Sequence, residues 1–210
     1  NSPGATFNTV APTANQNLTA SSTAATTSGG VHNYNGKIGF LNTGSLDVSV
    51  VLSVNCTGSS GVRVNYDVMT IRNPYDGSSN TRINEVTLQY RIGTSGAFTT
   101  LTGIEYQNNT TSQTGSVTTP QNSSTKAISL PAACDNQSVV QIRWISRQVS
   151  GGGARPSFAV DNIVVNFKPT TSASALNITS VTTSEMTINW TSGNGAGRAV
   201  FVKEASGAIT

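Results

Sequence analysis

Alternation of apolar and polar residues with a period of two is the feature that most constrains this chain. In residues 46–54 every even position is apolar, and the odd positions are polar except for Val51. Successive side chains of a β-strand point to opposite sides of the sheet, so this stretch predicts a strand with one buried face. The pattern recurs at Val62, Val64, Tyr66 and Val68, and again at Val86, Leu88, Tyr90 and Ile92.

The polar positions between the last four apolar residues predict a face that contacts solvent. They are Glu85, Thr87, Gln89 and Arg91. Later strands are expected at 126–130, 139–146 and 157–167. Clusters of Gly, Ser, Asn and Asp at 57–61, 73–77 and 93–96 are typical of the turns that join strands. Many half-buried strands without crossover helices favour antiparallel sheets packed face to face, so we predict an all-β, jelly-roll-like β-sandwich.

Composition excludes several other classes of protein. Only 10% of the residues are charged, and Ala, Glu, Lys and Leu are too scarce for a helical bundle or a coiled coil. No apolar run approaches the ~18 residues of a membrane span. The 12 Lys and Arg residues are scattered, whereas a nucleic-acid surface needs a concentrated basic patch, so no nucleic-acid partner is expected.

The chain divides by composition into two unequal parts. Residues 1–168 hold the predicted sandwich, within which the Ala-, Thr-, Ser- and Asn-rich residues 1–36 are either an arm or an irregular edge segment. A break at residues 168–172 resembles a short linker. Strands are expected beyond it at 176–181, 186–191 and 199–203, but residues 169–210 are too few for an immunoglobulin-like sandwich of about 100 residues. This second unit is therefore expected to be truncated.

Two stretches resemble known families. The segment Ser157–Val165 (SFAVDNIVV), with Ile142-Arg143-Trp144 and the glycines at 151–153, resembles the closing part of jelly-roll modules of the MAM, cleaved-adhesin and carbohydrate-binding type, over roughly residues 35–167. Residues 176–190 are similar to strands A and B of a fibronectin type III domain, as found in large secreted bacterial surface proteins. These resemblances imply an extracellular or cell-surface location and a partial immunoglobulin-like unit at the end of the chain.

The residues needed for catalysis are not gathered in any recognisable motif. His32, the only histidine, stands in a Gly- and Asn-rich stretch, and no nucleophile elbow is present. The nine acidic residues offer no spacing that selects a pair for glycoside cleavage. We therefore expect a chain that is not an enzyme. Tyr75 and Tyr106, in or near predicted loops, are the candidates for stacking against a carbohydrate ligand.

Asp161 lies within an otherwise apolar predicted strand, where an unpaired carboxylate would be costly. The jelly-roll resemblance implies a structural calcium ion at this position, and calcium prefers oxygen ligands. The alternative is that Asp161 pairs with an arginine or caps the preceding loop.

Cys56 and Cys134 are the only cysteines. A disulfide between them would close a loop of about 78 residues and could stabilise the fold by about 4 kcal/mol. The alternative is two buried thiols.

The leading functional hypothesis is a non-catalytic, extracellular β-sandwich module that acts in adhesion or assembly. The alternative is a carbohydrate-binding module of a secreted hydrolase, with glycans as its partners. The apolar faces predicted for residues 186–190 and 199–202 require a cover. The candidates for that cover are the first domain, downstream sequence and a neighbouring subunit by strand addition, of which we favour downstream sequence. The expected partners are therefore neighbouring domains or subunits of the same protein.

Overall fold

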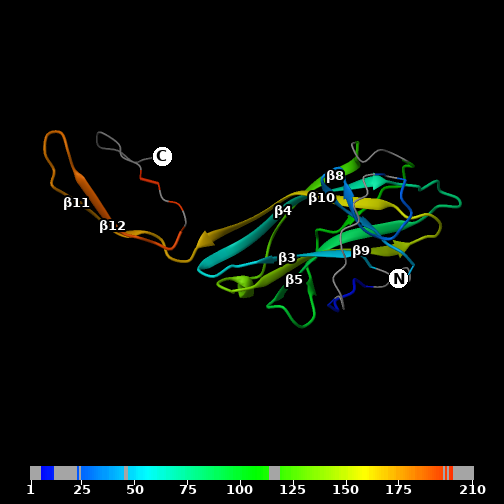
Figure 1. Ribbon diagram of the computed structural model, residues 1–210, viewed down its shortest axis with the longest axis horizontal. Coiled ribbons are helices and arrows are strands. Elements are labelled where there is room, and N and C mark those ends of the chain that lie inside the picture. The colour runs from blue at the N-terminus through cyan, green and yellow to red at the C-terminus, as the bar shows by residue number, and fades with distance from the viewer. Residues whose placement is uncertain are drawn as a thin grey trace.

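Two antiparallel sheets packed face to face form the body of the computed structural model (Figure 1). The structure describes residues 6–11, 23, 25–44, 47–113, 119–195, 197 and 199–200. The first sheet has the order β1 (Gly30–Tyr34), β2 (Lys37–Leu41), β10 (Ser157–Pro169), β4 (Ser59–Arg72), β8 (Gln121–Ser129). The second has the order β3 (Ser49–Val54), β9 (Val140–Ser150), β5 (Ile83–Ile92), β6 (Thr99–Thr100), and β7 (Tyr106–Gln107) also pairs with β5. A short 3-10 helix covers Ala132–Cys134.

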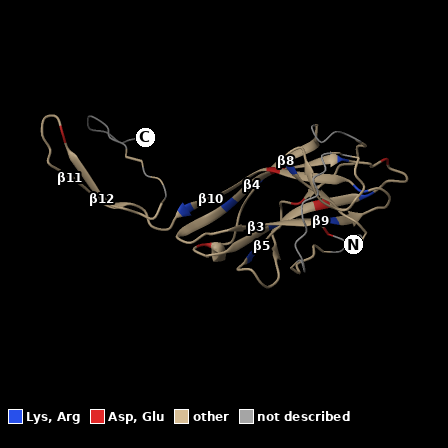
Figure 2. Cartoon of the chain, in the orientation of Figure 1, with Lys and Arg blue, Asp and Glu red and all other residues tan. Residues whose placement is uncertain are grey.

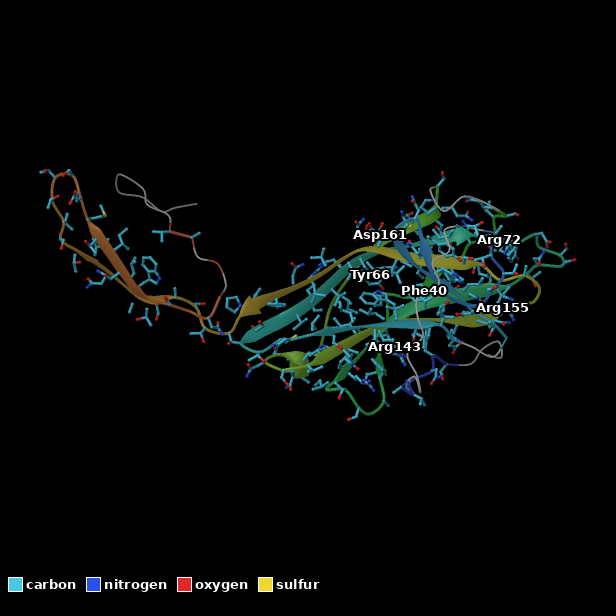
Figure 3. The ribbon with its side chains drawn as sticks, in the orientation of Figure 1. Phe40, Tyr66, Arg72, Arg143, Arg155 and Asp161 are labelled. Atoms are coloured by element: carbon cyan, nitrogen blue, oxygen red, sulfur yellow. The ribbon has the colours of Figure 1, made fainter. Side chains whose placement is uncertain are left out.

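The hydrophobic core lies between these two sheets. The inward face of β4 contributes its even-numbered residues from Val62 to Val68, all of which are buried. Tyr66 meets Trp144 of β9 edge to face across the core, with the ring centroids 5.7 Å apart. Figure 3 shows Tyr66 and Phe40 between the sheets. The predictions of an all-β antiparallel sandwich and of a buried face on β4 are confirmed, and Trp144 is a core residue.

The prediction that alternate residues of β5 face solvent is wrong. Glu85, Thr87 and Gln89 are buried on the outer face of the second sheet. Two segments cover them. One is the stretch around residues 7–10, which is distant in sequence, and the other is the connection that follows β5 and carries Phe98 and Leu101. A local alternation pattern cannot reveal cover that arrives from elsewhere in the chain.

The opposite error occurs at β3. Val48 is buried as predicted, but Val50 is only half-buried and Leu52 is 36% exposed, while Leu46 lies outside the described residues. The reason is that β3 is the edge strand of the second sheet and pairs only with β9. Its apolar side chains therefore lack a neighbour on one flank.

Residues 1–36 are not wholly irregular. Residues 30–34 form β1, which pairs with β2 from Gly30↔Leu41 to Tyr34↔Lys37. The ring of Tyr34 lies over Gly39, at a point where any Cβ would collide with it. Residues 1–5, 12–22 and 24 lie outside the described residues.

Beyond the sandwich, β11 (Ser174–Thr179) and β12 (Thr187–Thr191) form a separate two-stranded antiparallel sheet. Figure 1 shows this hairpin beyond the ends of β4 and β10. Residues 199 and 200 belong to no strand, and residues 201–203 of the third predicted strand lie outside the described residues. Among the described residues, no helix is long and apolar enough to cross a membrane.

Candidate interaction surface

The β11–β12 hairpin has one apolar face and one polar face. Ile178 pairs with Ile188, and Leu176 and Trp190 stand two residues away on the same side of the two strands. The opposite side carries Asn and Thr residues, at positions 177, 179, 187 and 189. This division is typical of a strand pair that covers a hydrophobic core on one side and meets water on the other.

No described residue covers the apolar face. Its large side chains are exposed to 69% at Leu176, 50% at Ile178, 50% at Met186 and 39% at Trp190. Hydrophobic side chains that are exposed together in this way make a candidate interaction surface. A lone hairpin is marginal in water, since it needs a third strand or a packed layer for stability. We call these four residues, with Ile188, the hairpin face.

Asn194 ties the base of the hairpin to the sandwich. Its side-chain amide donates to the carbonyl of Gly58 at 2.8 Å and to the Thr170 hydroxyl at 3.1 Å, and its Oδ1 accepts from the Thr171 main-chain N–H at 3.0 Å. Thr170 also donates its main-chain N–H to Gly58. The predicted linker is therefore hydrogen-bonded to the turn at Gly58, and β10 continues to Pro169 before the hairpin begins. The sequence gives no sign of this role for Asn194.

Polar groups surround Asp161 on the outer face of the first sheet, on the side away from Arg143 in Figure 3. Its Oδ2 lies 3.8 Å from the Lys37 ammonium, so the basic neighbour of Asp161 is a lysine and not the predicted arginine. Asp67, its cross-strand neighbour, accepts from Thr125 at 2.6 Å and from Asn162 at 2.7 Å. The Asn162 amide, followed by the Thr125 hydroxyl, lowers the pKa of Asp67.

Calcium at Asp161 stays a prediction. The two facing carboxylates of Asp161 and Asp67 supply hard oxygen donors, which suit the ion, but the Lys37 ammonium lies beside one of them. No three His, Cys, Asp or Glu side chains come together within the part of the chain that the structure describes.

The structure places the two candidate tyrosines in different environments. Tyr75 is half-buried in the β4–β5 connection. Tyr106 is only 5% exposed, because its ring packs edge to face against Phe158 with the centroids 5.8 Å apart. Its hydroxyl donates to the Asn122 carbonyl at 2.5 Å and lies 2.9 Å from the Thr70 hydroxyl. The prediction that Tyr106 offers a stacking surface is therefore wrong, and it is a core residue whose hydroxyl is hydrogen-bonded.

Both cysteines are buried as free thiols in this structure. The turns that carry them are joined by main-chain hydrogen bonds, including one from the Cys56 N–H to Gln137. Burial, with Cys56 and Asp135 as smaller causes, raises the pKa of Cys134 to about 11. The thiols are close enough to influence one another, and the disulfide between them stays a prediction.

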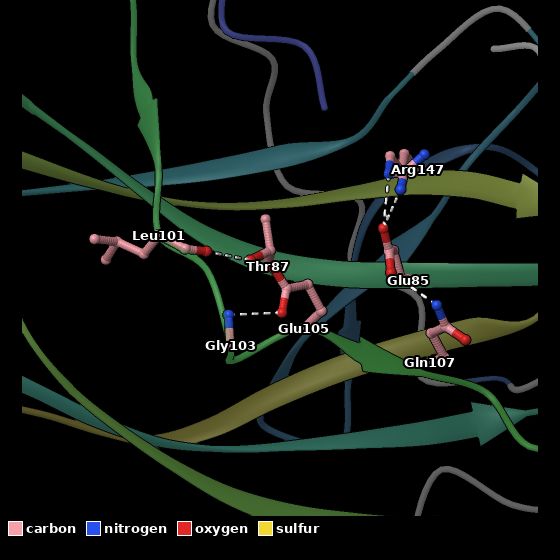
Figure 4. A network of polar contacts seen from close by, with 7 residues as sticks. All are labelled: Glu85, Thr87, Leu101, Gly103, Glu105, Gln107 and Arg147. Carbon is pink, nitrogen blue, oxygen red and sulfur yellow. Dashed lines mark hydrogen bonds and ion pairs between the residues drawn. The ribbon is translucent and has the colours of Figure 1, made fainter. Parts of the chain in front are cut away.

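Acidic side chains on the second sheet are engaged in hydrogen bonds and ion pairs (Figure 4). Glu85 Oε1 lies 2.5 Å from the Arg147 guanidinium, and its Oε2 accepts from Gln107 at 2.9 Å. Glu105 accepts from the Gly103 main-chain N–H. His32 is buried, and its Nε2 bonds the carbonyl of Ser28. These contacts join strands and loops, as expected for groups that hold a fold together.

Charged residues make up only 10% of the sequence, and Figure 2 shows how sparsely they are distributed over the described residues. The hairpin itself carries a single charged residue, Glu185, in its turn. A surface with so little charge favours apolar and main-chain contacts over electrostatic attraction. Comparison of the chain with protein-family models and with curated proteins finds no match.

Proposed function

We propose that this chain is a non-catalytic, extracellular β-sandwich module that acts in adhesion or assembly. In this proposal the sandwich is the jelly-roll-like body and the hairpin is the start of a fibronectin type III-like unit. The hairpin face binds further β-strands of the same protein, supplied by a neighbouring domain or subunit.

The observation that carries the proposal is the uncovered hairpin face. A two-stranded hairpin with one exposed apolar side presents that side for packing against further strands. Burying the exposed part of its four large side chains would contribute roughly 1 kcal/mol each, given about 1.5–3 kcal/mol for full burial of such a side chain. The surface is therefore large enough to contribute several kcal/mol to docking.

The attachment through Asn194 supports the same proposal. A docking element transmits position or load only when it is fixed to its carrier, and Asn194 bonds to Gly58 and Thr170 at the base of the hairpin. The polar face of the hairpin, rich in Asn and Thr, suits contact with water after docking.

A matched pair of variants in β11 tests the proposal. Ile178→Asn places an amide on the hairpin face, and Thr179→Asn places the same amide on the polar face of the same strand. The protein is expressed in the cells that make it, and the fraction retained in its surface assembly is compared with the fraction released into the medium. We expect Ile178→Asn to be released and Thr179→Asn to be retained like the wild type.

Thermal melting of the sandwich controls for misfolding, since position 178 lies outside both large sheets. Equal retention of the two variants would overturn the proposal. Saturable binding of a glycan by the chain, lost in Tyr75→Ala, would instead support the carbohydrate-binding alternative.

A further inference from the structure

The outer face of the second sheet holds a short segment of the chain through one buried arginine. Arg143 is 2% exposed, and its guanidinium donates to the carbonyls of Asn8 at 2.5 Å and Val10 at 2.8 Å. Its Nε donates to Gln89 Oε1 at 2.7 Å. The Phe98 ring covers the guanidinium, whose carbon lies 3.9 Å from the ring centroid. We call residues 7–10 the arm, and Gln89, Phe98, Arg143 and Arg147 the arm seat.

The seat binds the arm through its main-chain carbonyls and through one aromatic side chain. Besides the two bonds from Arg143, the Asn8 carbonyl accepts from the Gln89 amide at 3.2 Å, and the Thr9 carbonyl accepts from the Phe98 main-chain N–H at 2.8 Å. One side chain of the arm is anchored: Phe7 is buried, and the Arg147 guanidinium lies 4.7 Å from the centroid of its ring. The seat therefore fits a peptide with an aromatic residue followed by three residues whose carbonyls are free to accept.

The arm belongs to no strand of either sheet, so it can leave the seat without breaking a β-ladder. An empty seat is costly, however, because the buried guanidinium would lose two of its acceptors. Burial already lowers the pKa of Arg143 to about 10, with nearby Arg91 as a smaller cause. The seat therefore requires an occupant with the chemistry of the arm, and a second copy of this chain carries an identical segment.

We propose that the arm exchanges between copies, so that residues 7–10 of one copy fill the arm seat of another. The tethered arm competes at an effective concentration on the order of millimolar, so exchange prevails where copies are concentrated side by side, as in an assembly. Exchange replaces each contact within a copy by the same contact between copies, which is the general basis of domain swapping. The inference uses only the arm and residues on or beside the second sheet, and it does not depend on the hairpin.

A peptide-binding experiment tests whether the seat accepts an arm from another molecule. The full chain carrying Phe7→Ala, which weakens its own arm, is titrated against a fluorescent peptide of residues 1–11, and anisotropy reports binding. We expect saturable binding that is roughly tenfold or more weaker for the peptide carrying Phe7→Ala, because aromatic anchors dominate such contacts. The matched peptide with Thr9→Ala should bind like the unaltered one, since the side chain of Thr9 is exposed.

These peptide changes cannot misfold the protein. Absence of binding up to roughly 1 mM, the effective concentration of a tethered arm, would overturn the proposal. Equal binding of all three peptides would do so as well.

Exchange between whole chains is measured with benzoylphenylalanine at position 7, in a mixture of unlabelled and nitrogen-15-labelled copies. We expect cross-links of mixed isotopic composition that increase with protein concentration and persist in Ile178→Asn. Cross-links confined to single copies at the highest concentration would show that the arm never leaves its own seat, and the proposal would then be wrong.

Discussion

Replacing Tyr106 by Phe tests whether this residue is a hydrogen-bonded core residue rather than a ligand contact. The substitution keeps the ring that packs against Phe158 and removes only the hydroxyl. Two hydrogen bonds are lost, one to the Asn122 carbonyl at 2.5 Å and one shared with the Thr70 hydroxyl at 2.9 Å. Thr70 is fully buried, so its oxygen loses a partner that water cannot replace.

The expected loss follows from these two bonds. A net hydrogen bond contributes about 1 kcal/mol, and an unsatisfied buried group costs about 1–3 kcal/mol, so the free energy of unfolding should fall by about 1–3 kcal/mol. A domain of this size loses roughly 2–4 °C of melting temperature per kcal/mol. Urea unfolding is followed through the fluorescence of Trp144, which is buried in the sandwich.

Tyr75→Phe is the matched control, because it removes the hydroxyl of a half-buried tyrosine in a loop. Its effect should stay within about 0.5 kcal/mol, as for most surface changes. The double variant Tyr106→Phe, Thr70→Val should be less destabilised than the sum of its single variants, because the two groups are partners. A neutral Tyr106→Phe, or a Tyr75→Phe of equal cost, would refute this reasoning.

Three further predictions concern ionisable groups. Asp161→Asn should lower the free energy of unfolding in calcium-free buffer by less than about 1 kcal/mol, since Asp161 and Lys37 form a partly exposed pair. If calcium instead stabilises the wild type strongly, and both a chelator and Asp161→Asn abolish that stabilisation, a bound calcium ion is established. Hydrogen bonds from Asn80 and Ser78 lower the pKa of Asp76 to about 2. The contribution of Asp76 to stability is therefore complete above its unfolded pKa of about 4 and is lost as the pH falls to about 2. The unfolding midpoint of Asp76→Asn should therefore depend less on pH over that range than the midpoint of the wild type. A carboxyl NMR titration should give the low pKa directly. Iodoacetamide at pH 8 should modify neither cysteine in the folded chain, because burial raises the pKa of both thiols. Rapid labelling of either cysteine would contradict its burial. If both cysteines still resist iodoacetamide after the chain is unfolded without reductant, the Cys56–Cys134 disulfide is established.

Local sequence patterns predict the strands well and their cover poorly. In β4 the alternation from Val62 to Val68 predicts both the strand and its buried face, since both neighbours of this central strand continue the sheet. In β5 the alternation predicts the strand, but Gln89 is buried because the arm lies over it. That contact joins positions 8 and 89, and no pattern within either segment indicates it.

In the candidate site, too, local sequence patterns predict the strands but not the contacts between distant segments. The alternation in residues 186–190 predicts the apolar side of β12, and the structure leaves that side uncovered. By contrast, Asn194 reads as an ordinary turn residue between glycines, and its bonds to Gly58 and Thr170 depend on the folded positions of three separate segments. Tyr106 was misplaced for a related reason: its two-residue strand is too short to show an alternation that would identify a buried side.

The central claim is that further β-strands of the same protein cover the hairpin face, and hydroxyl-radical footprinting tests it most directly. Oxidation of Met186 and Trp190 is measured by mass spectrometry in the isolated 210-residue chain and in the protein taken intact from the cells that make it. Trp144 serves as the internal reference, because it is buried in the sandwich in both samples. We expect Met186 and Trp190 to be oxidised readily in the isolated chain and protected several-fold in the intact protein. Equal oxidation of these two residues in both samples would contradict the claim.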